Sequence, residues 1–192
     1  MPTPNPDAYA FMKSRRSRPA KTLTGPVPDR DTVFDLLEIA ARTPDHGKLE
    51  PWRFIVLEQN ALSRLANTIP ARGEELGIDP EKIEKMRFQM ANAELAVAVI
   101  ASPKPSEKIP EIEQTLSAGA VAMQLLSAAL AAGWGANWLS GWASHDRVWR
   151  ETHLGLEPHE WIAGFIHIGT ETATPPDRPR PDLEQIVDWI SA

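Results

Sequence analysis

The sequence contains no cysteine among its 192 residues. This absence excludes disulfide bonds, thiolate metal sites and cysteine nucleophiles, and it suits a reducing cytoplasm. The five histidines lack the spacing of HExxH or any other zinc motif, so we expect no metal site. The chain also lacks the GxSxG motif of serine hydrolases and the GxxxxGK[ST] loop, so acyl transfer and P-loop chemistry have no support.

Negative charge outweighs positive charge in this chain, so the formal net charge is −6. This argues against broad attraction to nucleic acid or to anionic membranes. The N-terminus has no charged start followed by an apolar run, so we expect no secretory signal. The longest apolar stretch, 116–135, is rich in Ala, Ser and Gly and contains Gln124, unlike a membrane span. We therefore expect a cytoplasmic protein.

The length of the chain fits one domain, residues 1–192, and no internal repeat divides it. Pro-Asp pairs at residues 6 and 28 predict helix starts, and Pro44 predicts a helix end. Helical spacing of apolar residues completes the set of expected helices: 6–15, 28–43, 61–69, 80–90, 111–132, 144–151 and 182–190.

About four strands are predicted, over 52–58, 95–102, 136–142 and 161–169. The run 95–102 is continuously apolar, which is typical of a strand covered on both faces. Helices dominate among these strands, so the expected fold class is α+β. The helix 111–132 is apolar on nearly every side and must be buried all round, which suggests that a second subunit also covers it.

The segment KSRRSRP (13–19) concentrates positive charge in an acidic chain. Residues 1–30 carry six Lys and Arg residues against Asp7 and Asp29, a local balance of +4. The arginines have a plain interpretation as solvated charges that complement a helix C-terminus. A nucleic-acid arm would need longer basic tracts or interleaved aromatics, and the kinase-like spacing is incomplete. A site for one compact anion is the remaining interpretation, because arginine forks and a serine hydroxyl match phosphate oxygens.

Two further segments have unusual composition. In RTPDHGKLEPW (42–52), the residues 44–47 are ordinary turn chemistry, yet Arg42, His46 and Lys48 gather just before a strand. In AAGWGANWLSGW (131–142), the glycines close a helix and precede a strand, which is the reverse of the dinucleotide-binding fingerprint. We therefore interpret Gly133 as a helix C-cap and reject a Rossmann site.

Three motifs in this order resemble the nitroreductase-like FMN-dependent oxidoreductase family, particularly its small bacterial members. They are Arg15-Arg16-Ser17 at the end of the first helix, the RTPDHGKLEPW turn, and the run 117–141. The resemblance spans nearly the whole chain. It implies an α+β fold with a central antiparallel sheet of about four strands flanked by helices. It also implies a homodimer whose long buried central helices meet at the interface, with FMN bound between the subunits.

The resemblance also implies site residues. Arg15, Arg16 and Ser17 match the triplet that holds the flavin phosphate. Arg42 and His46 match positions that reach the flavin from the other subunit, and residues 128–133 match a contact with the nicotinamide nucleotide. The segment that passes alongside the flavin corresponds to Trp138, Leu139 and Ser140, and the late basic residues of the phosphate site correspond to Arg178 and Arg180.

This chain departs from the family pattern at several positions. Glu50 stands where many relatives have Gln, and Lys48 where they often have Asn. Pro19 stands where a basic residue commonly lies. Positive charge near flavin N1 stabilises the reduced form. We therefore expect Lys48, Arg18 or Lys21 to supply that charge instead.

The function implied is that of an NAD(P)H-dependent flavin oxidoreductase. NADH or NADPH would deliver hydride to FMN, and a flat electron-poor acceptor such as a nitroaromatic or a quinone would remove it in a ping-pong cycle. No side-chain catalyst is assigned. Two alternatives stay open: a flavin store or sensor without turnover, and a cofactor-free structural or adaptor dimer.

Overall fold

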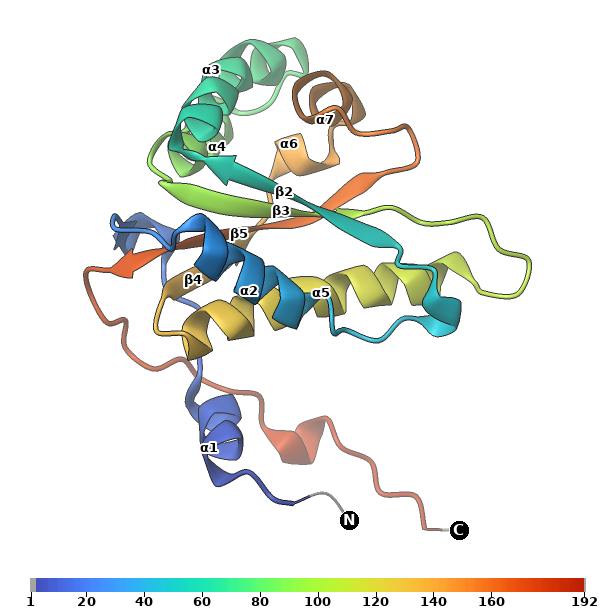
Figure 1. Ribbon diagram of the computed structural model, residues 1–192. Coiled ribbons are helices and arrows are strands. Elements are labelled where there is room, and N and C mark those ends of the chain that lie inside the picture. Colours follow the sequence, from blue (N-terminus) through green and yellow to red (C-terminus); the bar gives the residue numbers. More distant parts are fainter. Residues whose placement is uncertain (1–2, 192) are drawn as a thin grey trace.

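The computed structural model describes residues 3–191 (Figure 1). Its strands are β1 (Leu23–Thr24), β2 (Trp52–Glu58), β3 (Leu95–Ala101), β4 (Gly135–Leu139) and β5 (Trp161–Glu171). Its longer helices are α1 (Pro6–Ser14), α2 (Arg30–Ala40), α3 (Gln59–Glu75), α4 (Pro80–Ala91), α5 (Glu111–Ala131) and α7 (Arg147–Leu154). Short helical turns are η1 (Ala20–Thr22), η2 (His46–Lys48), α6 (Trp142–His145) and η3 (Leu183–Gln185).

The strands form one open antiparallel sheet in which β3 lies between β2 and β5, while β1 and β4 also pair with β5. All seven residues of β3 are buried, which confirms the prediction of a strand covered on both faces. Its side chains alternate between two core clusters. Ala98 and Ile100 face one cluster, and Val97 and Val99 face the other.

A layer of helices covers each face of the sheet (Figure 1). Helices α3, α4, α6 and α7 pack on one face around the buried Trp149, and α2 and α5 pack on the other face. This arrangement confirms the predicted α+β class with an antiparallel sheet flanked by helices. The sheet has a fifth strand, β1, which escaped prediction because two residues carry no periodicity.

Most helix starts follow the capping chemistry that predicted them. The side chain of Asn5 accepts a hydrogen bond from the Ala8 N–H at 3.1 Å, and Pro6 follows as the first residue of α1. Asp29 caps α2 in the same way, with its carboxylate 2.9 Å from the Thr32 N–H. Helix α3 extends well beyond the predicted 61–69. The prediction ended the helix before Pro70, whereas the structure continues it through that proline.

The prediction of a helix over 182–190 is wrong. The structure has only the short turn η3 there, followed by irregular chain. Its apolar residues Ile186, Trp189 and Ile190 are exposed, with Trp189 at 92% of its reference area. Helical spacing alone did not produce a helix, because this segment has no surface of its own chain on which to bury an apolar face.

Helix α5 is long and apolar enough, by length and composition, to cross a membrane. However, half of its apolar window is buried inside the molecule, and it packs against α2, β3, β4 and β5, which is typical of a core helix. The opposite face leaves Ile112 and Leu116 uncovered, at 61% and 65% exposure. The prediction for α5 was burial on all sides. Within a single chain the helix is buried on one face, and its opposite face is exposed.

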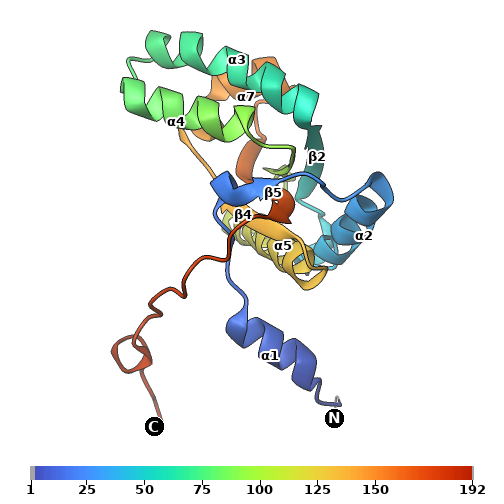
Figure 2. The same cartoon turned by 90° about the vertical axis from the view of Figure 1, so that its left-hand side faces the viewer.

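Helix α1 and the C-terminal tail both project from the body on the α5 side of the sheet (Figures 1 and 2). No residue of α1 is buried, and Tyr9 and Met12 are both more than 60% exposed. Both projecting segments therefore carry exposed apolar side chains.

Candidate functional site

The segment after α1 is fixed against β4 by its backbone. The N–H of Arg18 donates to the carbonyl of Ala136 at 2.8 Å, and the side-chain amide of Asn137 donates to the carbonyl of Arg18. The N–H of Arg15 caps α1 by donating to the Phe11 carbonyl. The segment is therefore held to α1 at Arg15 and to β4 at Arg18.

Two arginine nitrogens in this segment are buried without a partner. Among residues 3–191, neither Nε of Arg15 nor Nη1 of Arg16 makes a hydrogen bond, although both atoms are shielded from solvent. Buried guanidinium donors normally find an acceptor. Ser17, which is half-buried, follows directly. These two donors are therefore available to a negatively charged group, which is the role that the resemblance implies for the Arg15-Arg16-Ser17 triplet.

The C-terminal tail brings another cation to the same place. The pKa of Arg15 is lowered, first by burial and then by the nearby positive charge of Arg180. Arg180 itself lies 3.8 Å from Asp177, measured from Nη2 to Oδ1. Arg178 is exposed, and its N–H donates to the Asp177 side chain. Of the two late arginines, Arg180 is therefore the one whose charge acts on Arg15.

A cavity of about 330 Å³ opens next to this segment, between η1, α4, β4 and β5. We call it the β4 cavity. Its apolar lining is Pro19, Ala20, Phe88, Ala93 and Leu139. Its polar lining is Lys21, Lys85, Gln89, Asn92, Asn137 and His167.

Trp138, in the middle of β4, packs closely on β5. Its indole Nε1 donates to the Ala163 carbonyl at 3.1 Å, and a side chain at Gly164 would collide with the indole ring. Leu139 reaches the β4 cavity, and Ser140 follows at its exposed end. The structure thus joins Arg18, which directly follows the predicted triplet, to the strand that carries Trp138 and Leu139.

The predicted residues Arg42, His46 and Lys48 lie in a different part of the fold from the Arg15-Arg16-Ser17 triplet. Nδ1 of His46 is 2.7 Å from Oε2 of Glu113, and the hydroxyl of Ser117 donates to the Pro44 carbonyl, so this loop packs on the first turns of α5. The triplet, in contrast, directly precedes Arg18, which is bonded to β4, the strand that follows the last turn of α5. A helix of 21 residues separates the two groups by about 30 Å.

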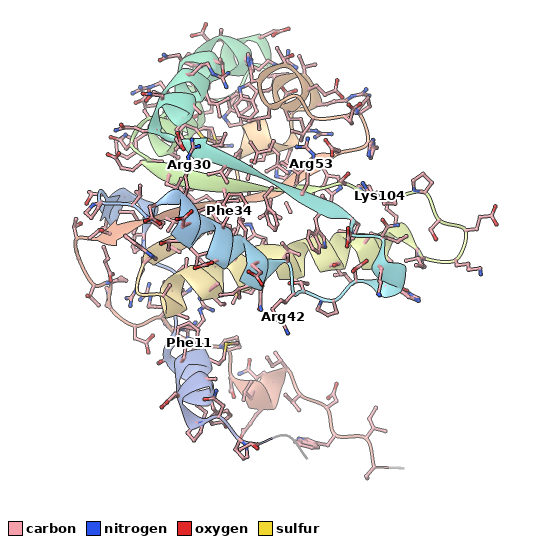
Figure 3. The ribbon with its side chains drawn as sticks, in the orientation of Figure 1. Phe11, Arg30, Phe34, Arg42, Arg53 and Lys104 are labelled. Carbon is pink, nitrogen blue, oxygen red and sulfur yellow. The ribbon has the colours of Figure 1, made fainter. Side chains whose placement is uncertain are left out.

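The loop that carries His46 has an unusual backbone. Lys48 and Glu50 have φ values of 53° and 47°, which is the left-handed region, and Gly47 has φ of 75°. The N–H of Glu50 donates to the Asp45 carboxylate at 2.9 Å and helps to hold the loop. Side chains other than Gly adopt this region at a cost of about 1–2 kcal/mol each. Arg42 points away from the sheet, on the side of α5 where Phe11 lies (Figure 3).

Sequence reasoning missed Lys85, Gln89, Asn92, Asn137 and His167. Lys85 lies in the charged run of α4, which has the composition of an ordinary solvated helix face, and only the packing of α4 beside η1 brings it to the cavity (Figure 2). His167 is 3% exposed within β5, and burial lowers its pKa to about 4. No group of His and carboxylate residues with the arrangement of a metal site occurs in residues 3–191.

Comparison with known proteins agrees with this geometry. The model of the nitroreductase family matches residues 12–170, and the chain therefore belongs to the nitroreductase family. It is 33% identical over 164 residues to the "Putative NAD(P)H nitroreductase YdjA" of Escherichia coli, covering 85% of this chain and 88% of that protein. It is 34% identical over 165 residues to a "Putative NAD(P)H nitroreductase" of Haemophilus influenzae, with the same coverage of 85% and 88%.

Solved structures share the fold. A nitroreductase-like family protein from Bacillus cereus superposes with a TM-score of 0.80 at 21% identity over all of both chains. A nitroreductase from Desulfovibrio desulfuricans, solved in complex with FMN, superposes with a TM-score of 0.73 at 20% identity, covering 99% of this chain and 100% of that chain. The fold prediction and the family resemblance are confirmed.

Proposed function

We propose that this protein is an FMN-dependent NAD(P)H oxidoreductase that acts as a single flavin-binding domain in a cytoplasmic homodimer. The observation that carries the proposal is the pair of buried, unpartnered nitrogens on Arg15 and Arg16, in the segment that continues into the Pro19–Lys21 wall of the β4 cavity. The names of the relatives and the FMN complex of a protein with the same fold support the choice of cofactor and electron donor.

The residues present fit FMN. The phosphate carries between one and two negative charges at neutral pH, and the donors of Arg15 and Arg16 would neutralise it, with Ser17 and Arg180 alongside. The flavin ring would extend along Trp138, Leu139 and Ser140 towards the β4 cavity. When bound, FMN would accept hydride from NADH or NADPH and pass it to a flat electron-poor acceptor, such as a nitroaromatic or a quinone, in a ping-pong cycle.

The second subunit would supply Arg42, His46 and Lys48. These residues lie about one α5 length from the triplet in the same chain, so they would reach the flavin only from a partner. The uncovered residues Ile112 and Leu116 of α5 offer the apolar face for such a dimer. A groove of about 420 Å³ beside it, between Phe11, Ile39 and the last turns of α5, continues this face and includes part of the predicted nicotinamide contact.

The first experiment is the visible absorbance spectrum of the purified protein, followed by anaerobic addition of NADH or NADPH. A flavin spectrum that bleaches supports the oxidoreductase. A spectrum that persists with both donors favours a flavin store or sensor. A colourless protein that also fails to bind added FMN overturns the proposal and favours an adaptor dimer.

The phosphate assignment is tested with the double variant Arg15→Ala/Ser17→Ala. We expect weaker FMN binding with an unchanged circular dichroism spectrum, because the anion contacts are lost while the fold is retained. Arg30→Ala is the matched control, since Arg30 is an exposed arginine that pairs with Glu58 on the surface. Equal FMN affinity in the double variant and in the control would refute the assignment.

The dimer is tested with Leu116→Glu, which places a charge on the uncovered face of α5. We expect a monomer by light scattering and loss of FMN in the same preparation, since each flavin site would need both chains. A monomeric variant that keeps FMN would show that one chain is sufficient.

A further inference from the structure

The β4 cavity has an unusual charge for so acidic a protein. Two lysines line it, Lys21 from η1 and Lys85 from α4, while no carboxylate among residues 3–191 does so. The remaining polar lining consists of the amides of Gln89, Asn92 and Asn137, together with His167. The cavity is therefore a cationic, amide-lined pocket in a chain whose formal net charge is −6.

The histidine does not contribute to that charge at neutral pH. Burial lowers the pKa of His167 to about 4, so its imidazole is neutral in the working range of most enzymes. The positive charge of the cavity therefore comes from the two lysine ammonium groups.

The other cations considered from the sequence are in different places. Nη1 of Arg18 lies 3.5 Å from Oε1 of Glu171, so its charge is already paired. Lys48 lies in η2, at the opposite end of α5. Within one chain, Lys21 is the candidate from the original three that reaches the cavity, and Lys85 joins it from a helix that is distant in sequence.

The two ends of a flavin ring differ in chemistry. One edge is an apolar dimethylbenzene, and the other is a uracil-like edge of carbonyls and ring nitrogens that matches amide donors and acceptors. Acceptance of hydride leaves negative charge over N1 and O2 of that polar edge, and the donor leaves as NAD(P)⁺. A pocket with three amides and two ammonium groups is complementary to the polar edge rather than to the apolar one.

We propose that Lys85, assisted by Lys21, faces the N1–O2 edge of the bound flavin and replaces the basic residue that Pro19 displaces. The inference rests on the proposed function. In this arrangement α4 sets the redox potential of the flavin, because a cation beside N1 stabilises the reduced form more than the oxidised form.

The test compares the midpoint potential of FMN bound to the wild-type protein and to Lys85→Gln, by anaerobic titration against reference dyes. We expect the variant to lose about tenfold more affinity for reduced FMN than for oxidised FMN, which lowers the two-electron potential by about 30 mV. The affinity for oxidised FMN should change by less than about threefold. Lys85→Arg should retain most of the wild-type potential, because it keeps the charge.

Lys82→Gln is the matched control, since Lys82 is an exposed lysine of the same helix that does not line the cavity. The inference is overturned if Lys85→Gln and Lys82→Gln give the same potential, or if Lys85→Gln weakens both redox forms equally. That result would leave the proposed function standing, provided that the wild-type protein binds FMN through Arg15 and Ser17. Failure of the wild-type protein to bind FMN would overturn both.

Discussion

The side-chain amide of Asn137 donates a hydrogen bond to the backbone carbonyl of Arg18, and this contact joins β4 to the segment that follows α1. The two residues are 119 positions apart in the sequence. Because Asn137 also lines the β4 cavity, one side chain connects the proposed phosphate site with the proposed ring site.

The first prediction concerns this contact. Asn137→Ala removes the hydrogen bond and leaves the Arg18 carbonyl without its side-chain donor, so the arginine segment loses part of its orientation. We expect FMN affinity to fall about tenfold, the equivalent of one lost hydrogen bond. Fluorescence titration of FMN measures this change. Asn60→Ala, at an exposed position of α3, should bind FMN as the wild type does.

The second prediction concerns acid stability. Arg53 and Glu160 form a two-pronged ion pair with both N–O distances at 2.7 Å, and the Glu160 side chain is only 4% exposed. The hydrogen bonds from Arg53 lower the pKa of Glu160 from 4.5 to about 2. Since the folded-state pKa is the lower one, this stabilisation is complete above about pH 4.5 and is lost as the pH falls towards about 2.

Glu160→Gln should therefore lower the free energy of unfolding at pH 7 by about 2 kcal/mol, less than for a fully buried pair because Arg53 is partly exposed. The difference from the wild type should shrink as the pH falls below about 4.5. Urea denaturation at several pH values measures both effects. Glu58→Gln, which breaks an exposed pair with Arg30, should change stability little. A difference for Glu160→Gln that is constant down to pH 3 would contradict the assignment.

The third prediction concerns the loop of η2. Glu50 has a left-handed backbone, which Asn tolerates better than Glu, so Glu50→Asn should raise the free energy of unfolding by about 1 kcal/mol. The same replacement at Glu38, an exposed position of α2, should lower stability slightly because Asn is a poorer helix former. Opposite signs in thermal denaturation would support the backbone argument. Equal signs would show that strain at Glu50 is relieved in solution.

The fourth prediction concerns the packing of Trp138 on β5. A methyl group at Gly164 collides with the indole ring, so Gly164→Ala should destabilise the protein by about 1–3 kcal/mol. It should also weaken FMN binding, because Trp138 lies in the segment proposed to flank the flavin. Trp138→Phe makes room for the added methyl group. The double variant should therefore be more stable than the sum of the two single changes predicts, and additivity would argue against a steric cause.

Much of the fold followed from local chemistry. The Pro-Asp starts, the continuous apolar run of β3 and the length of α5 predicted these elements almost to their ends, because each depends on neighbouring residues. The prediction of a helix over 182–190 was wrong because it also relied on neighbouring residues alone. Ile186 and Ile190 have helical spacing, yet a helical face needs something to pack against, and the sequence does not show whether that surface exists.

The candidate site likewise contains residues that local sequence could suggest and residues that it could not. Arg15, Arg16 and Ser17 are adjacent in the sequence, so the joint role proposed for them rests on one short segment. Lys85 could not be found in this manner, because its place beside Lys21 depends on how α4 packs near η1. In the sequence, Arg18 and Lys21 were equal candidates for the charge near the flavin. They differ in the structure because Arg18 is paired with Glu171.

The separation of the triplet and His46 by the length of α5 has a consequence for mixed assemblies. In the proposed homodimer, each flavin site combines Arg15 of one chain with His46 of the other. A heterodimer of an Arg15→Ala chain and a His46→Ala chain would then contain one doubly damaged site and one fully wild-type site. The heterodimer purified from co-expressed chains should thus hold half of the wild-type flavin content, a form of intersubunit complementation that neither variant achieves alone.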